Sequence, residues 1–220
     1  MTKMRVLLLS LTAVAAIGVA AAPANAATLF LWKVGGEFLE ENIQKRMVSI
    51  KQTENFTLES KFGLKNIDFT CTLPFSAAEI TGGRPGKATA SFEFTKCKVI
   101  EPAVCTTVKA EKVKLTGEIV EILTNGRKGH KGLLMKVGIE PKITLEPCAI
   151  SQRLNGKLVI DLGMGGVEAE KLTWLFPEIE EVENSAKEKI RPELGFGAEK
   201  ATLLGAAEAG LEKEEKWGAY

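Results

Sequence analysis

Over most of the chain, apolar and polar residues alternate one by one. The alternation is clear in residues 67–73 (IDFTCTL) and returns in residues 88–95 (ATASFEFT), after the glycine-rich turn at 82–86. A period of two residues is typical of strands that bury one face. Further runs with strand character occupy residues 28–33, 47–51, 56–60, 113–123, 135–139, 143–145, 158–162 and 172–176. The pattern therefore predicts many short strands.

Tight turns separate these runs. Asn125-Gly126 opens a basic loop between the runs at 113–123 and 135–139, and Asn155-Gly156 precedes the run at 158–162. Asn-Gly between two alternating runs is a strong signal for a β-hairpin, so we predict a hairpin at each pair. Regular short strands without a strand–helix rhythm predict an antiparallel all-β domain, either a β-sandwich or an open barrel.

The last quarter of the chain leaves two alternatives open. Residues 178–190 carry apolar side chains at helical spacing, with Glu early and Lys late, and fit either a short helix or a solvated loop. Residues 201–211 are rich in Ala, which favours a helix, but they also alternate like a strand. In the second case residues 213–216 form a turn into a final strand at 217–220.

The first 26 residues have the composition of an export signal. Lys3 and Arg5 precede an apolar run at 6–22, and the segment ends in Ala24-Asn25-Ala26. A basic start, an apolar centre and a small-x-small end predict a secretory signal peptide cleaved after Ala26 rather than a membrane anchor. Residues 27–220 then form a single secreted β-rich domain, and no later stretch is apolar enough to span a membrane.

Removal of the signal changes the charge only slightly. The loss of Lys3 and Arg5 lowers the formal net charge from +1 to −1. Charges of both signs are mixed along the rest of the chain. A nearly neutral protein of this kind gives no electrostatic reason to expect a nucleic-acid partner.

The number of cysteines also indicates an exported protein. Four cysteines follow the predicted cleavage site: Cys71, Cys97, Cys105 and Cys148. An even number in an exported chain predicts two disulfides, with three possible pairings. Spacing favours Cys97–Cys105 across the turn at Pro102, which leaves Cys71–Cys148 as the long-range bond. A zinc site is not expected, because the chain has no CxxC motif and only one histidine, His130.

Several short motifs carry a resemblance. They are Trp32–Gly36 (WKVGG), residues 56–60 and 67–71 (FTLES, IDFTC), residues 79–82 (EITG), residues 94–97 and 105–107 (FTKC, CTT), Gly117, Cys148 before a strand, and residues 216–219 (KWGA). On these motifs the chain resembles small secreted proteins that occur as several paralogues in some soil actinobacteria. It departs from them at Lys96, where they usually have Gly. The resemblance implies a secreted β-rich fold with paired cysteines, and strands rather than helix at 201–220. It implies no activity and no functional residues.

Candidate catalytic residues are few. Nucleophilic catalysis usually needs a histidine as base, and His130 lies in a glycine-rich basic loop with no GxSxG motif in the chain. We therefore interpret His130 as a solvated loop residue. Glycoside hydrolysis needs two carboxylates at a fixed separation; Glu93 and Glu118 lie on predicted strands but are expected to face outward. Gly163–Gly166 is interpreted as a turn, and no catalytic residue, cofactor or metal ligand is predicted.

Two segments are candidate binding surfaces. The loop at 127–131 (RKGHK) is the densest basic feature and could contact an anionic cell-wall polymer, although a hairpin tip kept soluble by its charge is the favoured interpretation. Residues 174–176 (WLF) could form an apolar patch, but a buried strand explains them better.

The leading hypothesis is therefore a secreted, non-enzymatic β module that binds a cell-wall or other extracellular polymer or has a structural role. The alternative is a secreted hydrolase with a glutamate pair.

Overall fold

The computed structural model describes residues 30–220 with the exception of residue 125. The predicted signal peptide and its cleavage site at Ala26 lie outside the described residues. Within them every named element is a strand and every strand pairing is antiparallel, so the prediction of an antiparallel all-β chain is confirmed. The same residues contain no helix long and apolar enough to cross a membrane.

The strands have the following bounds: β1 (Trp32–Val34), β2 (Glu37–Phe38), β3 (Lys45–Gln52), β4 (Phe56–Phe62), β5 (Lys65–Thr72), β6 (Phe75–Thr81), β7 (Lys87–Phe92), β8 (Thr95–Glu101), β9 (Thr107–Ala110), β10 (Val113–Ile122), β11 (His130–Val137), β12 (Lys142–Glu146), β13 (Ile150–Met164), β14 (Lys171–Leu175), β15 (Val182–Glu183), β16 (Lys189–Ile190), β17 (Leu194–Phe196), β18 (Glu199–Leu204), β19 (Ala206–Leu211) and β20 (Trp217–Ala219).

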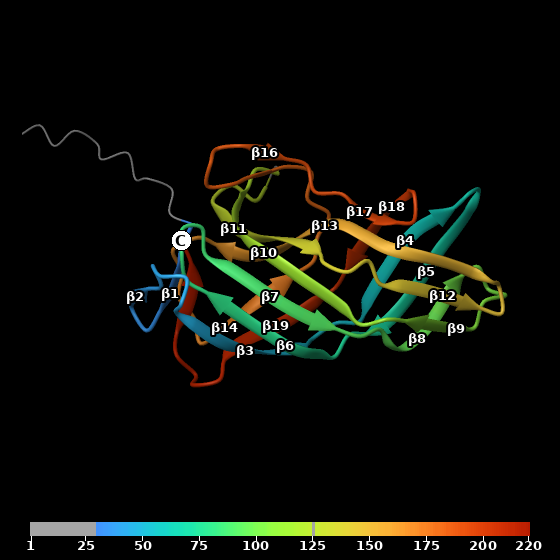
Figure 1. The fold of residues 1–220 in the computed structure, drawn as a ribbon, viewed down its shortest axis with the longest axis horizontal. Helices are drawn as coiled ribbons and strands as arrows, with labels where there is room; N and C mark the ends of the chain where they lie inside the picture. Colours follow the sequence, from blue (N-terminus) through green and yellow to red (C-terminus); the bar gives the residue numbers. More distant parts are fainter. Residues whose placement is uncertain (1–29, 125) are drawn as a thin grey trace, which may run out of the picture.

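Eight of these strands close into a barrel (Figure 1). The ring runs β10–β11–β13–β14–β19–β3–β6–β7, and β7 pairs with β10 again, for example Ala88 with Gly117. The prediction of a sandwich or an open barrel is therefore wrong for this part. Alternating strands look the same in a sandwich and in a barrel, and only pairings between distant segments decide which one forms.

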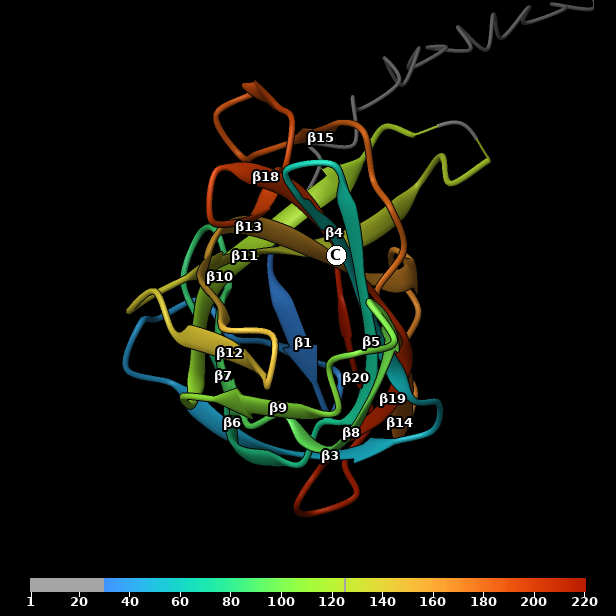
Figure 2. The ribbon, with the colours of Figure 1, turned by 90° about the vertical axis from the view of Figure 1, so that its right-hand side faces the viewer.

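A second group of strands continues beyond one end of the barrel, toward the right of Figure 1. One arm runs from β13 through β17, β18, β4 and β5 to β8, and the other runs from β13 through β12 to β9. Viewed from that end, these strands also curve around a common interior (Figure 2). We call them the outer strands.

Strand β13 is shared by the barrel and the outer strands. Its first half pairs with β12 and β17, and its second half, from Lys157 onward, pairs with β11. The predicted hairpin at Asn155-Gly156 is therefore wrong, because the strand continues straight through these residues. Gly156 has a φ of +86°, and a Cβ there would overlap the carbonyl oxygen of Glu193. This position thus needs glycine for a change of strand partner rather than for a turn. The other predicted hairpin, β10–β11, is confirmed.

A small sheet of β2, β1 and β20 lies at the end of the barrel opposite the outer strands (Figures 1 and 2). Trp32 and Trp217 from this sheet are fully buried, with ring centroids 5.6 Å apart. The indole nitrogen of Trp32 donates a hydrogen bond to the carbonyl oxygen of Lys87 at 2.8 Å, which joins the sheet to β7. The final strand predicted at 217–220 is confirmed.

One apolar cluster extends through the barrel and the outer strands, from Phe30 to Ala219. Trp174 and Phe176 belong to it, whereas Leu175 between them is 36% exposed and is the last residue of β14, so the predicted buried strand is confirmed for Trp174 but not for Leu175. Residues 201–211 form strands β18 and β19, as the alternation indicates. The helix considered for residues 178–190 is wrong: β15 and β16 form a short antiparallel pair, and Val182 packs in a small cluster with Ile122.

The two predicted disulfides are present, but their pairing differs from the prediction. Cys71 is bonded to Cys97, and Cys105 to Cys148. Cys71 and Cys97 lie on the neighbouring strands β5 and β8, with Cα atoms 4.1 Å apart. Cys105 and Cys148 come together because β9 pairs with β12, just beyond Thr107 and Glu146. The prediction is wrong because it relies on sequence spacing, which favours Cys97–Cys105. The pairing of β9 with β12, which brings Cys105 to Cys148, cannot be seen in the sequence.

Non-reducing peptide mapping should recover Cys71–Cys97 and Cys105–Cys148. The disulfides close chain segments with sequence separations of 26 and 43 residues. On the chain-entropy model, replacing either pair by Ser should lower the free energy of unfolding by about 3.5 to 4 kcal/mol, slightly more for the longer segment. Urea denaturation measures both losses. A peptide that joins Cys97 to Cys105 would contradict the pairing.

Candidate functional site

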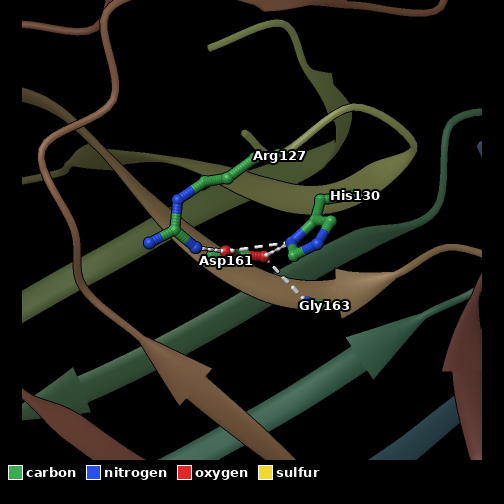
Figure 3. A network of polar contacts seen from close by, with 4 residues as sticks. All are labelled: Arg127, His130, Asp161 and Gly163. Carbon is green, nitrogen blue, oxygen red and sulfur yellow. Dashed lines mark hydrogen bonds and ion pairs between the residues drawn. The ribbon is translucent and has the colours of Figure 1, made fainter. Parts of the chain in front are cut away.

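The carboxylate of Asp161 is the most completely buried charge of the described residues, with 1% of the side chain exposed. The guanidinium of Arg127 donates a hydrogen bond to it, and Nδ1 of His130 lies 3.0 Å from Oδ1. The backbone N–H of Gly163 donates to Oδ1 at 2.8 Å (Figure 3). A buried charge is stable only when it is paired and hydrogen-bonded, and Asp161 meets both conditions.

Arg127 and His130 reach Asp161 from the β10–β11 loop. The N–H of His130 donates to the carbonyl oxygen of Arg127 at 3.0 Å, which closes a tight turn. The pairing of β11 with β13 then shifts register between His130 and Gly132. A bulge of this kind redirects a side chain, and here the His130 ring points at Asp161 (Figure 3). The loop is thus held against β13 by the aspartate.

The His130–Asp161 pair resembles two members of a catalytic triad, because a carboxylate orients the imidazole through Nδ1. Its environment differs from a triad. The side-chain hydrogen bonds of His130 among the described residues all go to Asp161, and the described cysteines are all in disulfides. Arg127 shares the same carboxylate. The expectation of a solvated histidine is also wrong, because only 24% of the His130 side chain is exposed.

The basic loop at 127–131 has little free charge. Arg127 and His130 face Asp161, and Lys131 is buried, with Nζ 4.6 Å from the ring centroid of Phe30 and 3.7 Å from a carboxylate oxygen of Glu121. Burial lowers the pKa of Lys131, and the attraction of Glu121 opposes that shift. Lys128 is the one basic side chain of the loop's described residues that is largely exposed. This geometry disfavours the loop as a contact for an anionic polymer.

A different charged region lies on the outer strands. A surface depression of about 670 Å³, which we call the acidic depression, is lined by Glu59, Ser60, Lys61, Asn66, Ile67, Asp68, Glu101, Glu199, Lys200 and Thr202. Four of these residues are acidic and two are basic. Lys200 also borders a second depression with four glutamates, Glu178, Glu180, Glu181 and Glu193, and with Arg191. This side of the molecule therefore carries an excess of negative charge.

Asp68 lies at the centre of the acidic depression. On one side it is the cross-strand partner of Glu59 on β4, and on the other side it is the partner of Glu101 on β8. Burial raises the pKa of Asp68, and the negative charges of Glu59 and Glu101 raise it further. Its Oδ1 is buried without a hydrogen-bond partner. Like charges directly opposite one another destabilise a sheet. The repulsion among Glu59, Asp68 and Glu101 therefore lowers the stability of this part of the fold.

The sequence does not single out this row. Asp68 is visible only as one polar position in an alternating run, and its neighbours depend on how β4, β5 and β8 pair. The glutamates considered from the sequence are not brought together: Glu118 pairs with Lys87 at the start of β7, whereas Glu93 follows the end of that strand. Among the described residues, no group of three or more side chains that could hold a metal ion is found.

Replacing Asp161 by Ala should lower the free energy of unfolding by about 3 kcal/mol, because Arg127 and His130 lose the carboxylate that compensates them. A matched control is Glu146→Ala, which removes an ion pair to Lys109 in which both side chains are about half exposed or more. Exposed pairs of this kind contribute about 0.5 kcal/mol. Urea denaturation of both variants is the measurement, and equal losses would show that Asp161 does not hold the loop.

Asp68→Asn should stabilise the protein at neutral pH. Because the folded state raises the pKa of Asp68, folding favours the protonated acid. That contribution is complete below the unfolded pKa of about 3.9 and is lost as the pH rises through the folded pKa. The gain for Asn at pH 7 should be about 0.5 to 1 kcal/mol and should disappear in acid. Thermal melting across the pH range measures it, with the exposed Glu93→Gln as control. An unchanged melting temperature at pH 7 would argue against repulsion in the row.

Comparison of the chain with protein-family models, curated proteins and solved structures gives no match. A function therefore has to be inferred from the positions and charges of its own residues.

Proposed function

We propose that this chain is a secreted, non-enzymatic β module that binds a positively charged partner outside the cell through the acidic depression. The observation that carries the proposal is the environment of Asp68, whose buried oxygen has no partner and whose strand neighbours are both glutamates. A cationic group placed in the depression would relieve this repulsion. Uncompensated charge in a surface hollow is a common property of binding sites.

The interior of the protein supports binding rather than catalysis. Apolar side chains fill the barrel and the outer strands as one cluster, and the acidic depression is a hollow beside exposed Glu59 and Glu101 rather than a cavity within that cluster. The His130–Asp161 pair is occupied by Arg127 and by the backbone of Gly163. Asp161 thus has a structural role in holding the β10–β11 loop, and we place recognition at the acidic depression.

Export is part of the same proposal. Two disulfides are compatible with an oxidising compartment, and the sequence of residues 1–26 has the pattern of a cleaved signal. The partner we favour is an extracellular or cell-wall polymer that carries amino groups, or a Lys-rich protein segment, because ammonium groups match a row of carboxylates. The likeness to secreted actinobacterial proteins remains a prediction.

A hydrolase is the second candidate, and the same depression favours it. Glycoside hydrolysis uses one carboxylic acid with a raised pKa as proton donor and a second carboxylate as base or nucleophile. Asp68 has the raised pKa, and Glu59 and Glu101 flank it. In this case Asp68→Asn would abolish an activity, whereas in a binding module the same change only weakens binding.

The test uses the mature protein with both disulfides and two probes, poly-lysine and soluble chitosan. We expect both to bind, with an affinity that falls as salt increases, and the double variant Glu59→Gln/Glu101→Gln should bind about tenfold more weakly. The control is Glu37→Gln/Glu54→Gln, which removes two exposed carboxylates outside the depression. Equal binding by both variants would refute the site. Release of new reducing ends from chitosan, lost in Asp68→Asn, would favour the hydrolase.

A further inference from the structure

The tip of the β4–β5 hairpin exposes apolar side chains. It consists of residues 61–65, Lys-Phe-Gly-Leu-Lys, and we call it the β4–β5 tip. Leu64 is completely exposed, at 104% of its reference area, and Phe62 is 42% exposed. Elsewhere on β4 and β5, Leu58, Ile67 and Phe69 are fully buried. The exposed pair is therefore a local feature of the tip and does not reflect a loosely packed hairpin.

The β4–β5 tip is presented on a firm base. The two strands pair continuously from Phe56–Cys71 to Phe62–Lys65, and Gly63, with a φ of +62°, makes the turn. Cys71 is bonded to Cys97, which ties β5 to β8 at the other end of the ladder. In Figure 1 the hairpin projects at the end of the molecule far from the C-terminus. The apolar side chains thus stand at the outermost point of a stiff element.

Two lysines flank the apolar residues. Lys61 and Lys65 are both exposed, and neither forms an ion pair with a residue in the described part of the chain. The nearest acidic residues on the same strands, Glu59 and Asp68, lie two and three positions back from the lysines. Two to three residues of a strand span about 7 to 10 Å, close to the Debye length of about 8 Å in physiological salt, and both carboxylates lie behind the tip. A molecule or membrane that approaches the β4–β5 tip therefore contacts the two positively charged lysines before the carboxylates.

This combination fits the boundary of a lipid bilayer. A specific protein interface buries about 800 Å² on each partner, far more than a five-residue hairpin tip presents. A bilayer needs no shape complementarity: apolar side chains enter the boundary between headgroups and acyl chains, and lysines remain among the headgroups. We propose that the β4–β5 tip anchors the secreted protein peripherally to membranes that contain anionic lipids. The β4–β5 tip shares Lys61 with the lining of the acidic depression, but this inference does not depend on that depression having a partner.

The test is flotation of the mature, disulfide-bonded protein with two kinds of vesicle, pure phosphatidylcholine and an equal mixture of phosphatidylcholine and phosphatidylglycerol. We expect binding to the mixed vesicles that weakens with salt. Leu64→Asp should reduce the partition coefficient at least about tenfold. Lys61→Gln/Lys65→Gln should reduce it about thirtyfold on the mixed vesicles. The control is Ile139→Asp, at an apolar residue that is 71% exposed on a different loop, and it should bind like the unchanged chain.

Fluorescence gives a second readout at the tip itself. The three tryptophans of the chain are buried, so Phe62→Trp adds the only exposed indole, and its emission should shift to the blue on mixed vesicles alone. Because Leu64 is fully exposed, unchanged thermal melting of Leu64→Asp will show that the fold is intact. Absence of flotation by the unchanged protein overturns the proposal, as does equal flotation of Leu64→Asp. If the emission of the Phe62→Trp variant shifts with a protein partner but not with vesicles, the proposal is overturned and the tip is assigned to protein recognition.

Discussion

The fold depends on one strand that belongs to two groups at once. Strand β13 is fifteen residues long, and it exchanges β12 and β17 for β11 at Gly156. Through this strand, both arms of the outer strands are hydrogen-bonded to the barrel: β12 and β17 pair with its first half, and β11 pairs with its second half. Its buried side chains also connect the apolar interiors into one cluster. Glycine is required at this position because the carbonyl oxygen of Glu193 occupies the space that a Cβ would need. The change of strand partners therefore depends on a single residue without a side chain.

The two aspartates show how the same side chain can serve opposite purposes. Asp161 is almost completely buried, yet it receives hydrogen bonds from Arg127, His130 and the backbone of Gly163, so its charge is compensated. Asp68 is less buried, but its neighbours are glutamates and one of its oxygens has no partner. The compensated charge fixes a loop in place. The uncompensated charge remains available for a ligand, and for this reason we place recognition at Asp68.

Local patterns in the sequence predict the strands well, because alternation directly reflects which side of a strand is buried. The alternation of residues 67–73 correctly indicates that Phe69 and Cys71 are buried. The closure of the barrel, the disulfide partners and the row around Asp68 all depend on which distant strands pair, and no local pattern encodes that. Asn155-Gly156 shows the same limit: a strong turn signal is overridden because neighbouring strands hold the chain straight on both sides of it.

The position of the disulfides follows from the difference between the two groups of strands. A closed ring has no free edges and is stabilised by its own pairings, and neither disulfide joins two strands of the barrel. Both lie among the outer strands and their connecting loops, where the arms end at β8 and β9. The acidic depression and the β4–β5 tip lie on these same strands. Covalent bonds therefore stiffen the part of the molecule that has the least support from closure, which is also the part that presents the proposed contact surfaces.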